Sequence, residues 1–154
     1  MIKAIIFDLD NTLLDFVKMK RFAVRAAVTA MNEAGLGVDE KKAFDDIFDL
    51  YLNKGWEHQQ VFDDYLQQTT GKVSNKVLAA GIVSYRRARE ATLLVYPNVN
   101  KTLIELLKMG IKLAVVSDAP SREAWMRLYY LNLHHIFDPV LTYDDSGSKK
   151  PSPK

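Results

Sequence analysis

The 154-residue sequence contains no cysteine, which excludes disulfide bridges and thiolate chemistry. It also lacks an apolar run of the roughly eighteen residues that would cross a bilayer, and its start lacks a signal-peptide cleavage site. Neither sign of charge dominates, because 21 basic residues face 19 acidic ones, so the charge balance does not favour nucleic acid as a partner. We therefore expect a cytoplasmic protein with neither membrane nor nucleic-acid partners.

The composition that is present is globular, with 48% hydrophobic and 26% charged residues. "KAIIFDLD", residues 3–10, has the length and β-rich character of a strand buried on both faces. From Met19 the apolar spacing changes to three and four, which predicts helices. We expect four of them without an intervening strand, over residues 19–34, 38–55, 57–70 and 74–93.

After residue 91 the pattern alternates between the two kinds of element. It predicts helices over residues 98–110 and 121–133, and strands over residues 111–118 and 139–143. Such alternation is typical of a parallel α/β sheet. The sequence therefore predicts an α/β core, residues 1–16 and 92–154, interrupted after its first strand by an all-helical insertion, residues 17–91.

Functional groups in an open parallel sheet gather beyond the carboxyl ends of the strands. Asp8 and Asp10 follow the first strand, Ser117 follows the second, and Lys149 and Lys150 follow the third. A carboxylate pair, a hydroxyl and an ammonium together suit a phosphoryl group and a hard cation. Magnesium prefers oxygen ligands, and a bound cation would offset the repulsion between the two carboxylates.

Three ordered motifs resemble those of the haloacid dehalogenase-like (HAD) hydrolase superfamily. Asp8-Leu9-Asp10-Asn11-Thr12 resembles the DxDx(T/V) signature, and "LAVVSDAP" resembles the second motif, which ends on Ser117. "GSKKPSPK" resembles the third motif, a lysine followed by Pro-x-Pro, which selects Lys150 over Lys149. The helical insertion lies where that superfamily places a cap. The resemblance implies a Rossmann-like three-layer core with an incomplete parallel sheet and an inserted four-helix cap.

The resemblance also implies a role for each matched residue. Asp8 would be the nucleophile that forms an aspartyl-phosphate, and Asp10 would protonate the leaving oxygen and then activate water. Asp8 would hold Mg²⁺, the expected cofactor, and the backbone carbonyl of Asp10 would help to hold it. Ser117 and the backbone of Asp118 would bind the phosphoryl oxygens, while Lys150 would balance their charge. The implied activity is a magnesium-dependent phosphatase that acts on a small phosphorylated metabolite.

Three alternatives compete with this interpretation. A 2-haloacid dehalogenase of the same superfamily generally lacks an acid at the position of Asp10, so we rank it lower. A non-catalytic HAD-like binding protein is expected to lose Asp8 or Asp10, and both are present. A phospho-acceptor receiver domain would carry its aspartate after a later strand and lack the insertion.

Thr12 is expected to brace the loop rather than to touch substrate.

The superfamily's fourth motif, an acidic pair that completes the magnesium site, has no counterpart in the sequence. Asp144 and Asp145 precede Lys150 and are expected to lie in a surface loop. We therefore expect either a fragment of a longer hydrolase, with impaired activity on its own, or one half of a two-chain enzyme. Without the missing strand, "KAIIF" would form an open sheet edge through which the chain could bind itself or a partner.

Other candidates have simpler structural explanations. We expect Trp56 and Tyr85 to belong to the helical core, and His134-His135 to be structural rather than metal-binding. Charged residues on helices usually form solvated faces. A cap that closes over a phosphate ester could use some of the polar residues of the insertion for specificity, but for each one singly the structural explanation is favoured: Lys18, Lys20, Arg21, His58, Arg86, Arg87 and Arg89.

Overall fold

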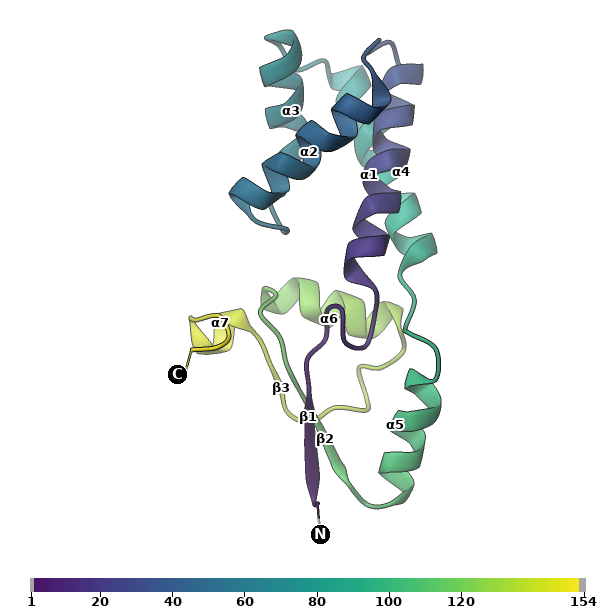
Figure 1. Cartoon of the computed structure of the whole chain (residues 1–154), viewed down its shortest axis with the longest axis vertical. Helices are drawn as coiled ribbons and strands as arrows, with labels where there is room; N and C mark the ends of the chain where they lie inside the picture. The colour runs from purple at the N-terminus through teal and green to yellow at the C-terminus, as the bar shows by residue number, and fades with distance from the viewer. Residues whose placement is uncertain (1, 153–154) are drawn as a thin grey trace. The chain divides into compact units, whose positions relative to one another are not determined.

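The computed structural model of the chain describes residues 2–152 and forms three strands and seven helices within that range (Figure 1). The strands make one small parallel sheet, which confirms the predicted α/β fold. None of the helices in the described range combines the length and the apolar character that a membrane crossing requires.

The chain divides into two compact units. One unit is a continuous helical segment, Lys18–Thr92. The other consists of two segments, one that ends at Val17 and one that begins at Leu93. We refer to them as the helical unit and the α/β unit.

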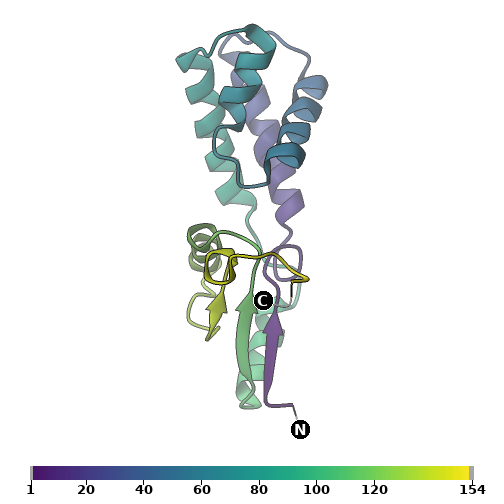
Figure 2. The same cartoon turned by 90° about the vertical axis from the view of Figure 1, so that its left-hand side faces the viewer.

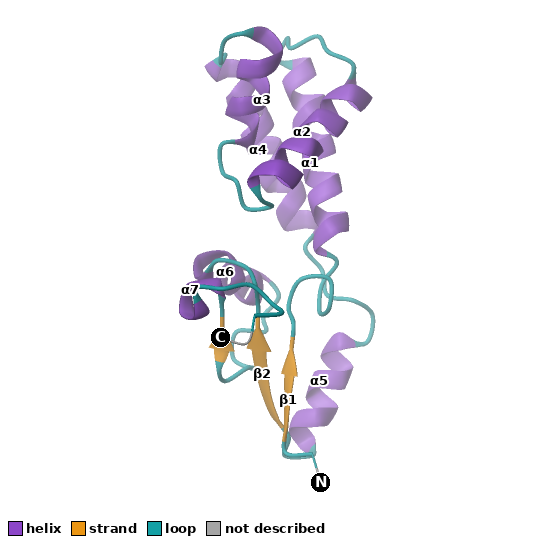
Figure 3. Ribbon diagram, turned by 60° about the vertical axis from the view of Figure 1, so that its left-hand side comes forward, coloured by secondary structure: helices purple, strands orange, loops and turns teal. Residues whose placement is uncertain are grey.

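The sheet of the α/β unit has the order β1-β2-β3, with β1 at Ala4–Phe7, β2 at Lys112–Val116 and β3 at Val140–Leu141. Figure 2 shows the three strands pointing the same way. Helix α5 (Val99–Lys108) packs against β2 (Figure 3). Helices α6 (Ser121–Tyr130) and α7 (Tyr143–Ser146) contact each other. Because all strands are parallel, their carboxyl ends share one edge of the sheet.

The prediction that the first strand is buried on both faces was wrong for β1. Its side chains alternate between exposed and half-buried, and Ile6 is 67% exposed. On the opposite face, the Phe7 ring meets the Phe137 ring edge-on, with centroids 6.1 Å apart. Within the described residues β1 pairs only with β2, so it forms an edge of the sheet. An apolar edge of this kind is suited to pairing with further chain.

The end of the described chain also differs from its prediction. The third strand contains two residues, not five, and helix α7 follows it where a surface loop was expected. A capping box starts this helix: the Thr142 side chain accepts from the backbone N–H of Asp145, the third helical residue, and Asp145 Oδ2 accepts from Thr142 N at 2.7 Å. Threonine followed three residues later by an acidic residue is a known helix-start pattern, so the sequence did carry this signal.

The helical unit contains most of α1 (Phe16–Glu33), then α2 (Glu40–Lys54), α3 (Val61–Thr70) and α4 (Asn75–Thr92). Its apolar core is contributed by all four helices, and Trp56 and Tyr85 pack against it as expected. Two details were wrong. Helix α3 starts at Val61 rather than at residue 57, because the preceding segment turns back, with His58 N donating to Gly55 O at 3.1 Å. Phe22, which the three-residue spacing from Met19 predicts to face the core, is 46% exposed.

Lys20 is not a solvated charge, because only 4% of it is exposed. Its ammonium donates to the Tyr85 hydroxyl at 2.8 Å and lies 4.1 Å from the centre of the Tyr51 ring. Burial, together with the nearby Tyr85, raises the pKa of the Tyr51 hydroxyl above its ordinary value. Buried ammonium groups need such partners, and aromatic faces supply one through cation–π attraction.

Helices α1 and α4 approach each other closely at Gly81. A Cβ atom at this position would lie 2.8 Å from Met31 Cγ and 3.0 Å from its sulfur, and Met31 is fully buried. Alanine favours a helix over glycine by about 1 kcal/mol, but overpacking a core costs about 1–3 kcal/mol. We therefore expect Gly81→Ala to lower the free energy of unfolding by roughly 1 kcal/mol in a urea titration.

The same substitution in a Met31→Ala background is the matched control. With the methionine removed, the clash disappears and the helix preference remains, so Gly81→Ala should then raise stability relative to Met31→Ala alone. A stabilising Gly81→Ala in the otherwise unchanged chain would contradict this account of the contact.

Candidate active site

The loop after β1 presents the two aspartates of the first motif. Leu9 is fully buried between them, and Leu13 N donates to Leu9 O at 2.9 Å, which closes a turn. Asn11 adopts a left-handed backbone with φ of 59°, a conformation that asparagine tolerates better than most residues. The buried leucine therefore anchors the loop, and Asp8 and Asp10 flank that anchor.

Asp8 receives hydrogen bonds on both of its carboxylate oxygens. Lys150 Nζ lies 2.6 Å from Oδ1, and Thr12 Oγ1 donates to Oδ2 at 3.0 Å. The side chains of Asp8 and Lys150 are 40% and 41% exposed, so an ion outside the protein can reach the pair. Thr12 thus holds the Asp8 carboxylate in place, as expected of a bracing residue.

Two further contacts fix the loop that carries Lys150. Its ammonium also donates to the Val116 carbonyl at 2.8 Å, and its backbone N–H donates to Asp118 Oδ1 at 2.9 Å. The Asp118 side chain thus ties the loop after β2 to the loop after β3. Of the two prolines in the third motif, Pro151 is described, and Pro153 lies outside the described residues.

Ser117 is buried at the end of β2, where 4% of it is exposed. Its backbone N–H donates to the Leu141 carbonyl of β3 at 2.9 Å, which extends the parallel ladder by one residue. Its hydroxyl oxygen accepts from the Ala119 N–H at 3.1 Å. A serine hydroxyl that accepts one hydrogen bond still has its own hydrogen to donate, which is what a phosphoryl oxygen requires.

Asp10 lies beside a residue that the sequence analysis did not single out. Arg127 Nη1 donates to Asp10 Oδ2 at 2.9 Å, and the guanidinium lies 4.7 Å from the centre of the Phe16 ring. Their side chains are only 7% and 24% exposed, so this is a largely buried ion pair. The available signal was a charge at an apolar position, because Arg127 shares the buried face of α6 with Ala124 and Leu128.

The two aspartates suit magnesium as partial ligands. Among residues 2–152, no group of three or more carboxylate, imidazole or thiol side chains is arranged to hold a metal ion. Mg²⁺ is often held by only one or two carboxylates, with water and substrate phosphate completing its shell. The half-exposed Asp8 carboxylate fits that pattern, and Asp10, whose carboxylate is paired with Arg127, would contribute its backbone carbonyl.

Helix α7, which follows β3, is tied to the start of helix α6. Asp144 Oδ2 accepts from Ser121 N at 2.7 Å, at the first residue of α6. The Thr142 hydroxyl and the Thr142 backbone N–H both donate to Asp145. These hydrogen bonds, that of the hydroxyl first, hold the pKa of the Asp145 carboxyl below its ordinary value. Both acids therefore have structural partners, and neither is a spare metal ligand.

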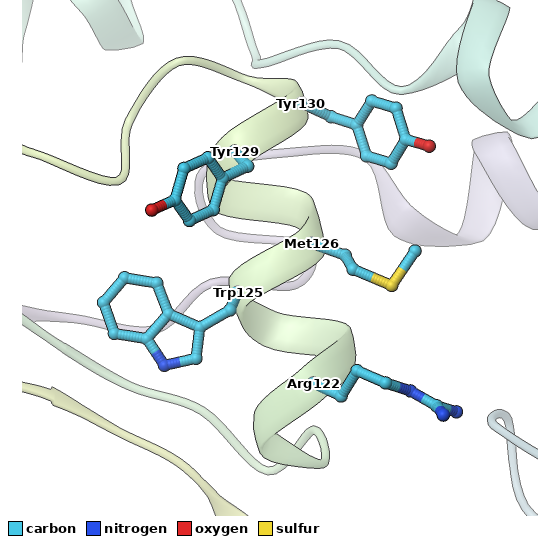
Figure 4. Close-up of a pocket in the computed structure, with 5 residues that line it drawn as sticks. All are labelled: Arg122, Trp125, Met126, Tyr129 and Tyr130. Carbon is cyan, nitrogen blue, oxygen red and sulfur yellow. The ribbon is translucent and has the colours of Figure 1, made fainter.

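The outward face of α6 lines a depression of about 500 Å³. Figure 4 shows Trp125 and Tyr129 on one side of the helix and Met126, Tyr130 and Arg122 on the other. His134 stacks on Tyr129, with ring centroids 4.2 Å apart, so this histidine has a packing role. All the lining residues come from one helix, and the depression is separate from the aspartate loop.

Comparison with protein families places the whole chain in one group. The model of a hydrolase family, haloacid dehalogenase-like hydrolase, matches residues 2–154. The chain is 38% identical over 151 residues to a glyceraldehyde 3-phosphate phosphatase of Methanocaldococcus jannaschii, with 98% of this chain and 66% of the relative covered. It is 31% identical over 153 residues to a phosphoglycolate phosphatase of Aquifex aeolicus, with coverage of 98% and 65%. The chain thus spans about two thirds of the length of these curated relatives.

Solved structures support the same fold. The crystal structure of a candidate beta-phosphoglucomutase from Thermotoga maritima superposes with a TM-score of 0.74 at 24% identity, covering 99% of this chain and 66% of that one. A HAD family hydrolase from Deinococcus radiodurans, with bound phosphate and sodium, gives a TM-score of 0.59 at 19% identity, with coverage of 95% and 60%. At these identities the similarity concerns the fold alone.

Proposed function

The chain belongs to the haloacid dehalogenase-like hydrolase family, and on that premise we propose that it is a magnesium-dependent phosphatase. Its substrate is a small phosphate ester, and its reaction proceeds through a phosphorylated Asp8. The relatives named above are phosphatases of small phosphorylated compounds, which supports this substrate class.

The observation that carries the proposal is the contact between Asp8 and Lys150. These residues are 142 positions apart in the sequence, yet their charged groups lie 2.6 Å apart at the carboxyl end of the sheet. Phosphoryl transfer depends mainly on positioning and on stabilising negative charge. A carboxylate nucleophile held by an ammonium is suited to that work, because the lysine offsets the repulsion between Asp8 and an anionic phosphate.

The reaction takes place in two displacements. In the first, an Asp8 carboxylate oxygen attacks phosphorus, the ester P–O bond breaks, and the leaving oxygen takes a proton from Asp10. In the second, water attacks the same phosphorus, Asp10 takes a proton from that water, and the bond between phosphorus and Asp8 breaks. Inorganic phosphate and the free alcohol are the products, and Asp8 and Asp10 return to their starting states.

Three further groups bind the phosphoryl oxygens through both steps. Ser117 donates its hydroxyl hydrogen, the backbone near Asp118 donates N–H groups, and Lys150 supplies positive charge. Asp8 and Asp10 would hold the magnesium ion, which supplies charge neutralisation and orients the phosphate when it is bound.

The same proposal covers the arrangement of the chain and its surroundings. The helical segment of residues 17–91 acts as a cap that selects the ester, and residues 1–16 and 92–154 form the catalytic core. A small phosphorylated metabolite is the partner, and the cytoplasm is the compartment. The open edge of β1 is the surface through which the chain pairs with itself or with another chain.

The test is phosphate release by the purified full chain from phosphoglycolate and glyceraldehyde 3-phosphate, with Mg²⁺ and after removal of metal by a chelator. A catalytic metal ion is worth several kcal/mol, so we expect chelation to lower the rate by about 10²-fold or more and added Mg²⁺ to restore it. Titration calorimetry with Mg²⁺ alone provides a readout that does not depend on turnover. Because the chain is expected to be impaired on its own, release is also measured in a single turnover at high protein concentration. Release that continues unchanged in chelator, or no release from either ester under those conditions with Mg²⁺ present, would contradict the proposal.

A further inference from the structure

We propose that Arg127 is a positioning residue that orients the Asp10 carboxylate for proton transfer, an inference that rests on the proposed function. The geometry that points to it is one buried guanidinium placed between a carboxylate and an aromatic ring. Arg127 Nη1 donates to Asp10 Oδ2 at 2.9 Å, and the Phe16 ring centre lies 4.7 Å from the guanidinium carbon.

Helix α6 shows why this arginine differs from an ordinary surface charge. Its residues Ala124, Arg127 and Leu128 are all buried, at the three- and four-residue spacings that define one face of a helix. The other arginine of the helix, Arg122, has a side chain that is 75% exposed and contacts its neighbour Glu123. The same helix therefore carries one solvated arginine and one that points into the α/β unit.

A buried guanidinium is expensive to desolvate, and burial is tolerated when the group is paired. Its flat shape is also more rigid than a lysine ammonium, so it fixes the direction of the carboxylate that it binds. The guanidinium carbon lies over the Phe16 ring, and this contact restricts the movement of the guanidinium. The three side chains thus set the orientation of Asp10 before any substrate is present.

Orientation matters because Arg127 holds Oδ2 of Asp10, so the other oxygen, Oδ1, has to place a proton on the leaving oxygen and then accept one from water. A general acid contributes most when the leaving group is a poor one, such as an alkoxide, and little when it leaves readily as an anion. A residue that acts only through Asp10 therefore affects esters of poor leaving groups selectively. A residue that binds the phosphate itself affects all esters alike.

The experiment measures single-turnover rates for two esters with the full chain and Mg²⁺. Phosphoglycolate has a poor leaving group, and 4-nitrophenyl phosphate has a good one. We expect Arg127→Met to slow the first by about 10²-fold and to change nitrophenol release in the first turnover by less than about fivefold. Arg127→Lys should recover part of the loss, and Phe16→Leu should show a smaller loss of the same selective kind.

Two comparisons separate positioning from other roles. In an Asp10→Asn background, Arg127→Met should add less than about a twofold loss, because the residue through which it acts is already disabled. Arg122→Met, on the same helix, should leave both rates unchanged. Equal losses on both esters, a loss that adds fully to that of Asp10→Asn, or a change in KM alone would overturn the inference.

A structural readout keeps the inference testable apart from activity. In a crystal structure of the Arg127→Met chain, the Asp10 carboxylate should turn away from its present position, and circular dichroism should show that the variant is folded. If the unchanged chain releases no phosphate, the proposed function fails, and the crystal structure alone decides the role of Arg127. An Asp10 carboxylate that keeps its orientation without the arginine would overturn the inference.

Discussion

Asp8→Asn is expected to lower the rate of phosphate release by about 10⁴-fold or more, because it removes the attacking carboxylate while keeping its size. The amide is neutral and a poor nucleophile, and it also leaves the Lys150 ammonium without its anionic partner at 2.6 Å. The measurement is magnesium-dependent phosphate release from phosphoglycolate at saturating substrate.

The fold should survive this change. The Asp8 side chain is 40% exposed, and exposed ion pairs contribute only about 0–1 kcal/mol to stability, so the melting temperature should move little. Asp49→Asn, an exposed aspartate on α2 of the helical unit, is the control and should retain full activity. If Asp8→Asn kept more than about a hundredth of the original rate, Asp8 could not be the nucleophile, since loss of that group removes the covalent route.

Lys150→Met is expected to lower the rate by about 10²–10³-fold, the usual loss when one charge-stabilising group is removed from a reaction centre. The Lys150 backbone N–H would still donate to Asp118, so the loop should remain attached while the ammonium is lost. The effect should appear mainly in kcat, because the Lys150 ammonium acts on charge that shifts between Asp8 and the phosphoryl group as the transition state forms.

Lys149→Met is the matched control, since it removes the same charge one residue earlier. Lys149 is exposed, and its ammonium lies 6.0 Å from the Tyr143 ring centre rather than at the aspartate loop. We expect less than about a twofold change in rate for this variant. Equal losses from the two lysine substitutions would show a general effect of charge on the loop and would remove Lys150 from the mechanism.

Much of the architecture could be predicted from the sequence because the hydrophobic period changes with each type of element. The apolar residues from Met19 to Met31 repeat at three and four positions and lie in α1, whereas residues 111–118 form a short apolar run and contain β2. The exposure of Ile6 could not be predicted in the same way. An apolar strand sequence does not specify how many neighbours the strand has, and β1 has one within the described residues.

Some residues of the candidate site could be predicted from the sequence, and others could not. Asp8 and Lys150 could be placed at one edge because each follows a strand, and parallel strands end together. Arg127 and the side-chain role of Asp118 could not, because both depend on contacts between distant segments. Arg127 meets Asp10 across 117 positions and Asp118 meets Lys150 across 32, and no local pattern encodes either distance.

The contact between Asp8 and Lys150 has a consequence for folding kinetics. It closes a loop of 142 residues, and the entropy lost on closing a loop grows with its length. Helices such as α1 and α4 form through local hydrogen bonds on a much faster timescale than long-range pairing. Recovery of the Asp8–Lys150 pair during refolding therefore marks the late stage at which the two ends of the chain come together, well after helical content has returned.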